Sequence, residues 1–378
     1  MNIDKIQILK ECNDKIFSYE ISKKFDNIIF IYTPPKVGST TLVSSIRLSA
    51  SNNFLTAHIH DEKMLNILTN YDETNTITIN DIIEYNASLG KNVFVIDVYR
   101  NPIERKISEY FELLANYHFN NCEANMNKYN IELIIKRFNR IFTHVAEGDY
   151  FFEKYDITPP ESFNFDNKYL MVVKNNIKYI KLRLIDSHLW GKILSEILNT
   201  EIIIVKDYQT ENKAIGNIYN EFKSRYKIPI NFFEKIKACK YFNYYNSEDE
   251  RKSYLNEWSN KITGEFEAFT VEQFKLYKEI STENQFNNVI QRNHYLDFGC
   301  ICKSCFFKRK QIINKIKSGM TNINIRVIHE EAVAEKKIRK VKVLSNICNN
   351  IQKIQHKKPS GKNMGTDFTL SGIIVNKR

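Results

Sequence analysis

The sequence predicts an α/β fold in which helices flank a central parallel sheet. Three runs of strand length, 28–33, 54–58 and 92–98, are mostly apolar. Segments with the period of an amphipathic helix alternate with them, at 40–50, 61–69, 80–89 and 102–118. Strands that are apolar on both faces and alternate with helices are typical of a parallel sheet that is covered on both sides.

Further along the chain, the pattern predicts a hairpin and another helix. The apolar runs Tyr169–Val173 and Tyr179–Ile185 flank a Lys-Asn-Asn turn, which indicates a hairpin. A helix is expected over 189–198, and the isoleucine-rich run Glu201–Lys206 follows it.

Beyond about residue 212, the chain changes to charged, aromatic-rich segments. Their periodicity predicts long helices over 212–226, 230–240 and 248–282. We therefore predict an α/β domain over 1–290, whose part from about 212 is helical. A helical, basic, cysteine-containing C-terminal extension, partly disordered, is expected over 291–378.

The net positive charge of the chain indicates which classes of binding partner to expect. Its 378 residues include 55 Lys and Arg against 44 Asp and Glu, a formal net charge of +11. Such a balance favours an acidic partner: a nucleotide, an anionic glycan, nucleic acid or a membrane surface. The first residues lack the basic-then-apolar layout of a secretory signal, and no apolar stretch approaches the roughly 20 residues that span a bilayer. We therefore expect a cytoplasmic protein.

A phosphate-binding turn is predicted directly after the first apolar run. Residues 35–41 read Pro-Lys-Val-Gly-Ser-Thr-Thr, where a strand is expected to meet a helix. The first N–H groups of a helix lack partners within it and bind anions together with the helix dipole. Gly38 permits a tight turn, and Lys36 supplies a charge. Because this lysine precedes the glycine, the order is not that of a Walker A loop. Taken alone, the segment is equally compatible with an ordinary strand–turn–helix corner.

A second anion-binding segment follows the run 92–98. Pro102 suits the first turn of a helix, which places Arg100 at the end of a strand. Arg105 and Ser108 are three residues apart and share a face of that helix. An arginine holds phosphate by a forked pair of hydrogen bonds, and a serine donates one more. Alone, a helix that starts at Asn-Pro and carries solvated arginines explains the segment as well.

Together, the two segments resemble the signature of sulfotransferases that use 3′-phosphoadenosine 5′-phosphosulfate (PAPS). In that family a Pro-Lys-x-Gly loop with following hydroxyl residues holds the 5′-phosphosulfate, and an Arg-(Asp/Asn)-Pro-x-x-Arg-x-x-Ser segment binds the 3′-phosphate. The match extends over about residues 26–260 and looks like that of bacterial capsular polysaccharide synthesis proteins. The resemblance implies a P-loop-like three-layer fold and cofactor-binding roles for Lys36, Val37, Gly38, Ser39, Thr40, Thr41, Arg100, Arg105 and Ser108.

The resemblance also implies a reaction, the transfer of a sulfuryl group from PAPS to a hydroxyl of a capsular or surface carbohydrate. Lys36 is then expected nearest the bridging oxygen that gains charge. We expect the catalytic base at His60, with His58 behind it, because both follow a strand at the sheet edge where ligands collect. The alternative for His60 is a cap for the helix that starts near Asp61.

A zinc site is the weaker hypothesis for the C-terminal region. His294, Cys300, Cys302 and Cys305 could supply four ligands, and the last two have knuckle spacing. Zinc sites usually join two separated ligand pairs, whereas these four residues lie within one short segment. We therefore favour reduced cysteines beside a basic helix.

Two other functions stay open from the sequence. A nucleotide-dependent phosphotransferase is disfavoured, because the Walker A order is missing and Asp97, inside a strand, is a poor magnesium ligand. A non-catalytic nucleotide- or glycan-binding module of a capsule assembly is the other alternative. The expected partners are a nucleotide co-substrate and a glycan acceptor, with allowance for peripheral contact with membrane-associated capsule machinery. Nucleic acid is not expected.

Overall fold

The computed structural model describes residues 3–70, 77–119, 122–142, 148–205, 210–283, 302–321, 325, 331–338 and 342. The chain divides into two compact units, 1–328 and 329–378. In the second unit, the longest described stretch is helical and covers 331–338. The sheet and all candidate site residues that the structure describes lie in the first unit.

Within the described residues, one five-stranded sheet forms the centre of the first unit. Its strands are β1 Asn27–Tyr32, β2 Phe54–Ile59, β3 Asn92–Tyr99, β4 Tyr169–Lys174 and β5 Ile177–Arg183. Their order is β2-β1-β3-β5-β4; the first four are parallel, and β4 is antiparallel to β5. The predicted α/β class with a mostly parallel sheet is thus confirmed, as is the hairpin.

Strand order places a ligand site at one edge of this sheet. From β1 the chain first goes to β2 on one side and then returns to β3 on the other. The carboxyl ends of β1 and β3 therefore lie at the point where the direction of winding reverses. Open α/β sheets bind their ligands in the crevice at such a point.

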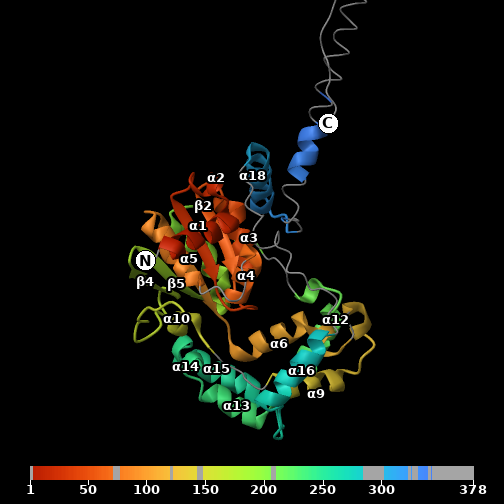
Figure 1. Ribbon diagram of the computed structural model, residues 1–378. Coiled ribbons are helices and arrows are strands. Elements are labelled where there is room, and N and C mark those ends of the chain that lie inside the picture. Colours follow the sequence, from red (N-terminus) through yellow and green to blue (C-terminus); the bar gives the residue numbers. More distant parts are fainter. Residues whose placement is uncertain are drawn as a thin grey trace, which may run out of the picture. The chain divides into compact units, whose positions relative to one another are not determined.

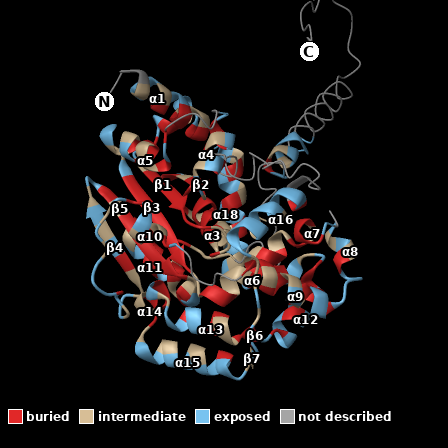
Figure 2. Cartoon of the chain, turned by 60° about the horizontal axis from the view of Figure 1, so that its bottom comes forward, coloured by how far each residue is buried: buried red, intermediate tan, exposed pale blue. Residues whose placement is uncertain are grey.

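The alternation of side chains along the strands explains the layers on both faces. Ile28 and Phe30 pack toward α1 (Ile3–Phe17), α4 (Glu62–Thr69) and α5 (Ile79–Ser88). Ile29 and Ile31 point to the opposite face, where α3 (Ser39–Ala50) and α11 (Trp190–Leu198) cover them. Because both faces are covered, the consecutive positions Ile28 to Ile31 of β1 are all apolar. Figure 2 shows the central strands buried along their length and the outer sides of the helices exposed.

A third apolar cluster lies in helices that gather at one end of the sheet (Figure 1). α6 leads from β3 directly into this cluster, so the helical part includes segments well before residue 212. Its main helices are α6 Pro102–Glu112, α7 Leu114–Tyr117, α9 Ile131–Ile141, α12 Gly216–Arg225, α13 Ile230–Lys237, α14 Lys240–Tyr245, α15 Glu248–Ser259 and α16 Val271–Glu283. The smaller elements and the last labelled helix are α2 Tyr19–Ser22, α8 Glu123–Met126, α10 Tyr150–Glu153, η1 Leu184–Leu189, η2 Thr210–Asn212, β6 Ile228–Pro229, β7 Ile262–Thr263 and α18 Lys303–Lys317.

The long helices expected from the sequence are broken into shorter ones. The segment 102–118 divides at Leu113, 230–240 divides before Lys240, and 248–282 is interrupted where β7 pairs with β6. Each piece packs a different apolar face into the third cluster, which a single straight helix cannot do.

The apolar run at 201–205 is not a strand of the sheet. The main-chain N–H groups of Ile203 and Val205 instead donate to the hydroxyls of Ser49 and Ser45 on α3, both at 2.9 Å. Side chains of a helix thus supply the acceptors that a neighbouring strand would have offered.

Candidate functional site

The loop between β1 and α3 has a backbone suited to bind an anion. Lys36 has φ +67° and Gly38 has φ +95°, both in the left-handed region. Gly38 is also the N-cap of α3, and a glycine has no side-chain oxygen that competes for the first N–H groups of the helix. Ser39 is buried in the first turn. The helix start therefore offers main-chain donors to a negatively charged group.

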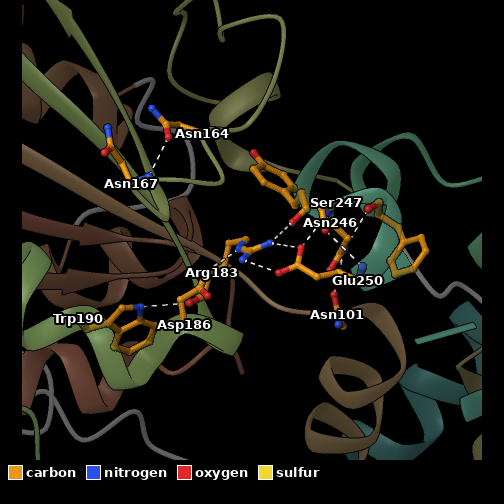
Figure 3. A network of polar contacts seen from close by, with 11 residues as sticks. Asn101, Asn164, Asn167, Arg183, Asp186, Trp190, Asn246, Ser247 and Glu250 are labelled. Carbon is orange, nitrogen blue, oxygen red and sulfur yellow. Dashed lines mark hydrogen bonds and ion pairs between the residues drawn. The ribbon is translucent and has the colours of Figure 1, made fainter. Parts of the chain in front are cut away.

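Gly38 is required by packing as well as by its backbone angle. A Cβ at this position would lie 2.8 Å from Leu184 Cδ1 and 3.2 Å from Trp190 Cη2. The indole of Trp190 is held in turn, because its Nε1 donates to the carbonyl of Arg183 at 3.1 Å (Figure 3). Arg183, the last residue of β5, thus positions the Trp190 side chain that packs beside Gly38.

The two segments predicted to bind phosphate meet at this edge of the sheet. β1 and β3 are neighbours, and Arg100 Nη1 donates to the carbonyl oxygen of Lys36 at 2.8 Å. Tyr219 of α12 is a second hydrogen-bond partner of Arg100. Ser108 is buried within α6. The loop and Arg100 are therefore parts of one site.

Lys36 lies in an ion-pair cluster that no sequence pattern indicated. Its Nζ is 3.0 Å from Glu112 Oε2, and Lys213 Nζ is 2.5 Å from the same oxygen. Burial by itself raises the pKa of Glu112, but the two ammonium groups outweigh it and lower the pKa to about 2. Burial lowers the pKa of Lys36, and Glu112 opposes that shift. Within the described residues, two cations share one carboxylate oxygen beside the loop.

His60 is held in the tautomer that a general base needs. Its Nδ1 lies 2.7 Å from the carbonyl oxygen of Thr33, which can only accept, so Nδ1 carries the proton and Nε2 of the neutral ring has the lone pair. Burial lowers the pKa of His60, which favours this neutral form. The ring of His58 packs edge-on against it at 4.6 Å. The alternative as a helix cap is wrong for His60, because Asp61 caps α4 and accepts from Met64 N at 2.8 Å.

Thr33 is positioned by a buried network of charges. Its hydroxyl donates to Asp97 Oδ1 at 2.7 Å, while Lys181 Nζ lies 2.7 Å from Asp97 Oδ2 and 2.5 Å from Asp149 Oδ2. Burial raises the pKa of Asp97 to about 6, although Lys181 opposes the shift. Tyr245 donates to the other oxygen of Asp149 at 2.9 Å. The network ties β1, β3 and β5 together behind the loop.

A second charged contact joins the sheet to the helical part. Arg183 makes a forked pair of hydrogen bonds with Glu250, at 2.7 and 2.9 Å, and its Nε lies 2.6 Å from Asp186 Oδ2. Figure 3 shows its guanidinium between Asp186 and the start of α15. These contacts hold α15 against β5.

The described part of the chain shows two of the four residues considered for zinc. Cys302 begins α18, where its sulfur accepts from Cys305 N at 3.5 Å, and Cys305 is buried. His294 and Cys300 lie outside the described residues. Across the residues that the structure describes, no group of three or more His, Cys, Asp or Glu is placed to hold a metal ion. Zinc therefore stays a hypothesis. The same residues include no helix long and apolar enough to cross a membrane.

No protein-family model, no curated protein and no solved structure matches this chain. A functional assignment therefore depends on the geometry of its own residues.

Proposed function

We propose that this protein is a sulfotransferase, with a P-loop-like arrangement of its sheet, that moves a sulfuryl group from PAPS to a hydroxyl of a carbohydrate. The acceptor is a capsular or surface polysaccharide or its precursor. The observation that carries the proposal is the hydrogen bond from Arg100 to the carbonyl of Lys36. It brings the segment with 5′-phosphosulfate features and the segment with 3′-phosphate features to one edge of the sheet.

The two segments suit a ligand with two separate anionic groups. The turn at 35–41 offers main-chain N–H groups and Lys36 for one of them. Arg100 offers a forked donor for the other, and Ser108 lies further along the chain on α6. PAPS has this arrangement, with a 5′-phosphosulfate and a 3′-phosphate on one ribose.

The ion pairs near Lys36 support a role in stabilising the leaving group. In the reaction the acceptor oxygen attacks sulfur, the bond from sulfur to the bridging oxygen breaks, and 3′,5′-adenosine bisphosphate leaves. An ammonium group at the bridging oxygen stabilises the charge that develops there. When Lys36 turns to the phosphate, Lys213 remains to neutralise Glu112. Glu112, which is partly buried, therefore keeps a cationic partner during the exchange.

His60 is the proposed base. Its Nε2 has the lone pair, and its lowered pKa keeps it unprotonated at neutral pH. The acceptor proton passes to this nitrogen as the oxygen attacks. His58 supports the ring of His60 from behind.

Calorimetry with 3′,5′-adenosine bisphosphate tests donor binding. We expect the wild type to bind it, and Arg100→Ala to lower the affinity at least about tenfold because a charge-assisted fork is lost. Arg225→Ala is the matched control, since Arg225 is an exposed arginine that pairs with Glu132 on the surface. Absence of binding by the wild type, or equal affinity in Arg100→Ala, would contradict the proposal.

Transfer is tested separately with labelled PAPS and the polysaccharide fractions of the host cell. We expect label in one fraction, and its loss in His60→Asn with bisphosphate binding retained. Binding without transfer to any fraction would instead favour a non-catalytic nucleotide- or glycan-binding module.

A further inference from the structure

A narrow pocket lies beside the residues that hold His60, and both Arg100 and Arg105 line it. Its wall includes Pro34 and Asp149. Pro34 follows Thr33, whose carbonyl accepts from His60 Nδ1, and Asp149 precedes Tyr150, whose hydroxyl donates to the main-chain oxygen of His60 at 2.7 Å. Both walls are therefore directly connected to the residues that hold the proposed base.

Arg105 supplies a positive charge to this pocket and forms no ion pair with a carboxylate among the described residues. It lines the pocket, and its charge acts on His60 and on Tyr150. Its Nε is buried and has no hydrogen-bond partner among the residues that the structure describes. A buried N–H of a charged group without a partner costs free energy, which a bound acceptor oxygen would recover. Arg100 lines the same pocket, but its guanidinium already donates to the carbonyl of Lys36 in the phosphate loop.

The other charges of the pocket do not cancel that of Arg105. Asp149 shares Lys181 with Asp97 and accepts from Tyr245, while Arg100 adds a second positive charge to the wall. Tyr241, also in the wall, donates its hydroxyl to Glu153. Pro102, at the first turn of α6, brings the positive end of that helix dipole to the same wall. The pocket therefore favours an anion.

We propose that this pocket binds an anionic substituent of the acceptor, with Arg105 as its cation. The acceptor is then an acidic carbohydrate that carries a carboxylate, sulfate or phosphate near the hydroxyl to be sulfated. The cavity volume is about 20 Å³. That is room for one or two water molecules, so the pocket takes the charged group and not a whole sugar ring. The assignment rests on the proposed function, and it places Arg105 on the acceptor instead of the donor 3′-phosphate that the sequence resemblance implies.

Calorimetry on the full chain tests the pocket with three sugars that differ in charge. Methyl glucuronide carries a carboxylate, glucose 6-sulfate carries a sulfate, and methyl glucoside is neutral. We expect the wild type to bind at least one acidic sugar about tenfold or more tightly than methyl glucoside, and the better of the two identifies the oxyanion. Arg105→Gln is expected to abolish this preference while the affinity for 3′,5′-adenosine bisphosphate changes less than about twofold.

Two further variants keep the test specific. Lys106→Gln removes the same charge from the next residue of α6, where Lys106 pairs with Glu109, and should leave the preference unchanged. Arg105→Lys keeps the charge without the fork and should retain part of the preference, which covers the case in which Arg105→Gln does not fold.

Three outcomes would overturn the assignment: equal affinity for acidic and neutral sugars in the wild type, a preference that survives in Arg105→Gln, or a bisphosphate affinity that falls in Arg105→Gln as it does in Arg100→Ala. Failure of the proposed function is distinguishable from these. If the wild type does not bind 3′,5′-adenosine bisphosphate but still prefers acidic sugars, and Arg105→Gln removes that preference, then the anion pocket is supported and the proposed donor site is not.

Discussion

Lys36 Nζ lies 3.0 Å from Glu112 Oε2, an oxygen that Lys213 also contacts at 2.5 Å. The Glu112 carboxylate is paired with the Lys36 ammonium group, which is the group proposed to bind the donor phosphate. An incoming anion must therefore compete with Glu112 for Lys36. Glu112 has Lys213 as a second cationic partner when it loses this contact.

Glu112→Gln is expected to raise the affinity for 3′,5′-adenosine bisphosphate by about threefold to tenfold, because the amide no longer neutralises Lys36. Calorimetry at neutral pH measures it. Glu109→Gln is the matched control, since Glu109 pairs with Lys106 on the same helix. An unchanged or weaker affinity in Glu112→Gln would show that Lys36 does not meet the ligand.

Glu112 also predicts a pH dependence of stability. Its pKa is about 2 in the fold, against an ordinary value of 4.5. A carboxyl group with a lowered folded pKa stabilises the fold above its unfolded pKa, and this contribution disappears as pH falls from 4.5 toward 2. We expect Glu112→Gln to lower the free energy of unfolding by about 2 kcal/mol at pH 7 and much less at pH 3. Denaturant titrations at the two pH values measure it, and a difference that does not vary with pH would contradict the prediction.

The two costs of replacing Gly38 can be separated. Gly38→Ala meets Leu184 Cδ1 at 2.8 Å and has an unfavourable positive φ. Gly90→Ala has a similar φ of +80° but no atom within 4 Å among those that the structure describes. We expect a loss of about 1 kcal/mol for Gly90→Ala and about 2 to 4 kcal/mol for Gly38→Ala, measured by denaturant unfolding. Equal losses would mean that packing against Leu184 and Trp190 does not restrict the loop.

Lys181 is the single cation bonded to two buried carboxylates in the described network. Lys181→Met leaves Asp97 and Asp149 without their shared partner, and we expect a loss of about 3 to 5 kcal/mol in the free energy of unfolding. Adding Asp97→Asn removes one of the stranded charges and should restore part of this loss. A double variant less stable than Lys181→Met alone would contradict the buried ion-pair account.

The transfer rate should follow the titration of His60. Burial lowers the pKa of His60 from its ordinary value, so the neutral base is present at neutral pH and is lost only as pH falls through that lowered pKa. We expect kcat/KM to rise with pH in the acidic range and to level off before pH 7. Asp97, with a pKa of about 6, is the other group near Thr33 that titrates there, and Asp97→Asn should keep the acidic limb. If kcat/KM no longer falls at acidic pH in Asp97→Asn, the titration belongs to Asp97 instead of His60.

Local patterns were sufficient to predict the central strands and the loop. Ile28 to Ile31 are buried on alternating faces that are both covered, and an apolar residue at every position signals that environment. Helix lengths were harder to predict, because Leu113 and the β6–β7 pair interrupt segments whose periodicity continues across the break. Such breaks depend on which face each piece must bury, and that is set by distant partners.

Local sequence patterns predict the α/β class, the strand–turn–helix at residues 35–41 and the candidate anion-binding residues. The partners of each charged side chain follow from the folded arrangement, because Glu112 is 76 residues from Lys36 and Lys181 is 84 residues from Asp97. The folded arrangement also distinguishes Arg100, which donates to the loop, from Arg105, whose Nε has no hydrogen-bond partner among the described residues. The physical reason is the range of the two effects. The burial of a strand can be predicted from the periodicity of its own apolar residues. An ion pair joins residues that are distant in the sequence, and local periodicity carries no information about such contacts.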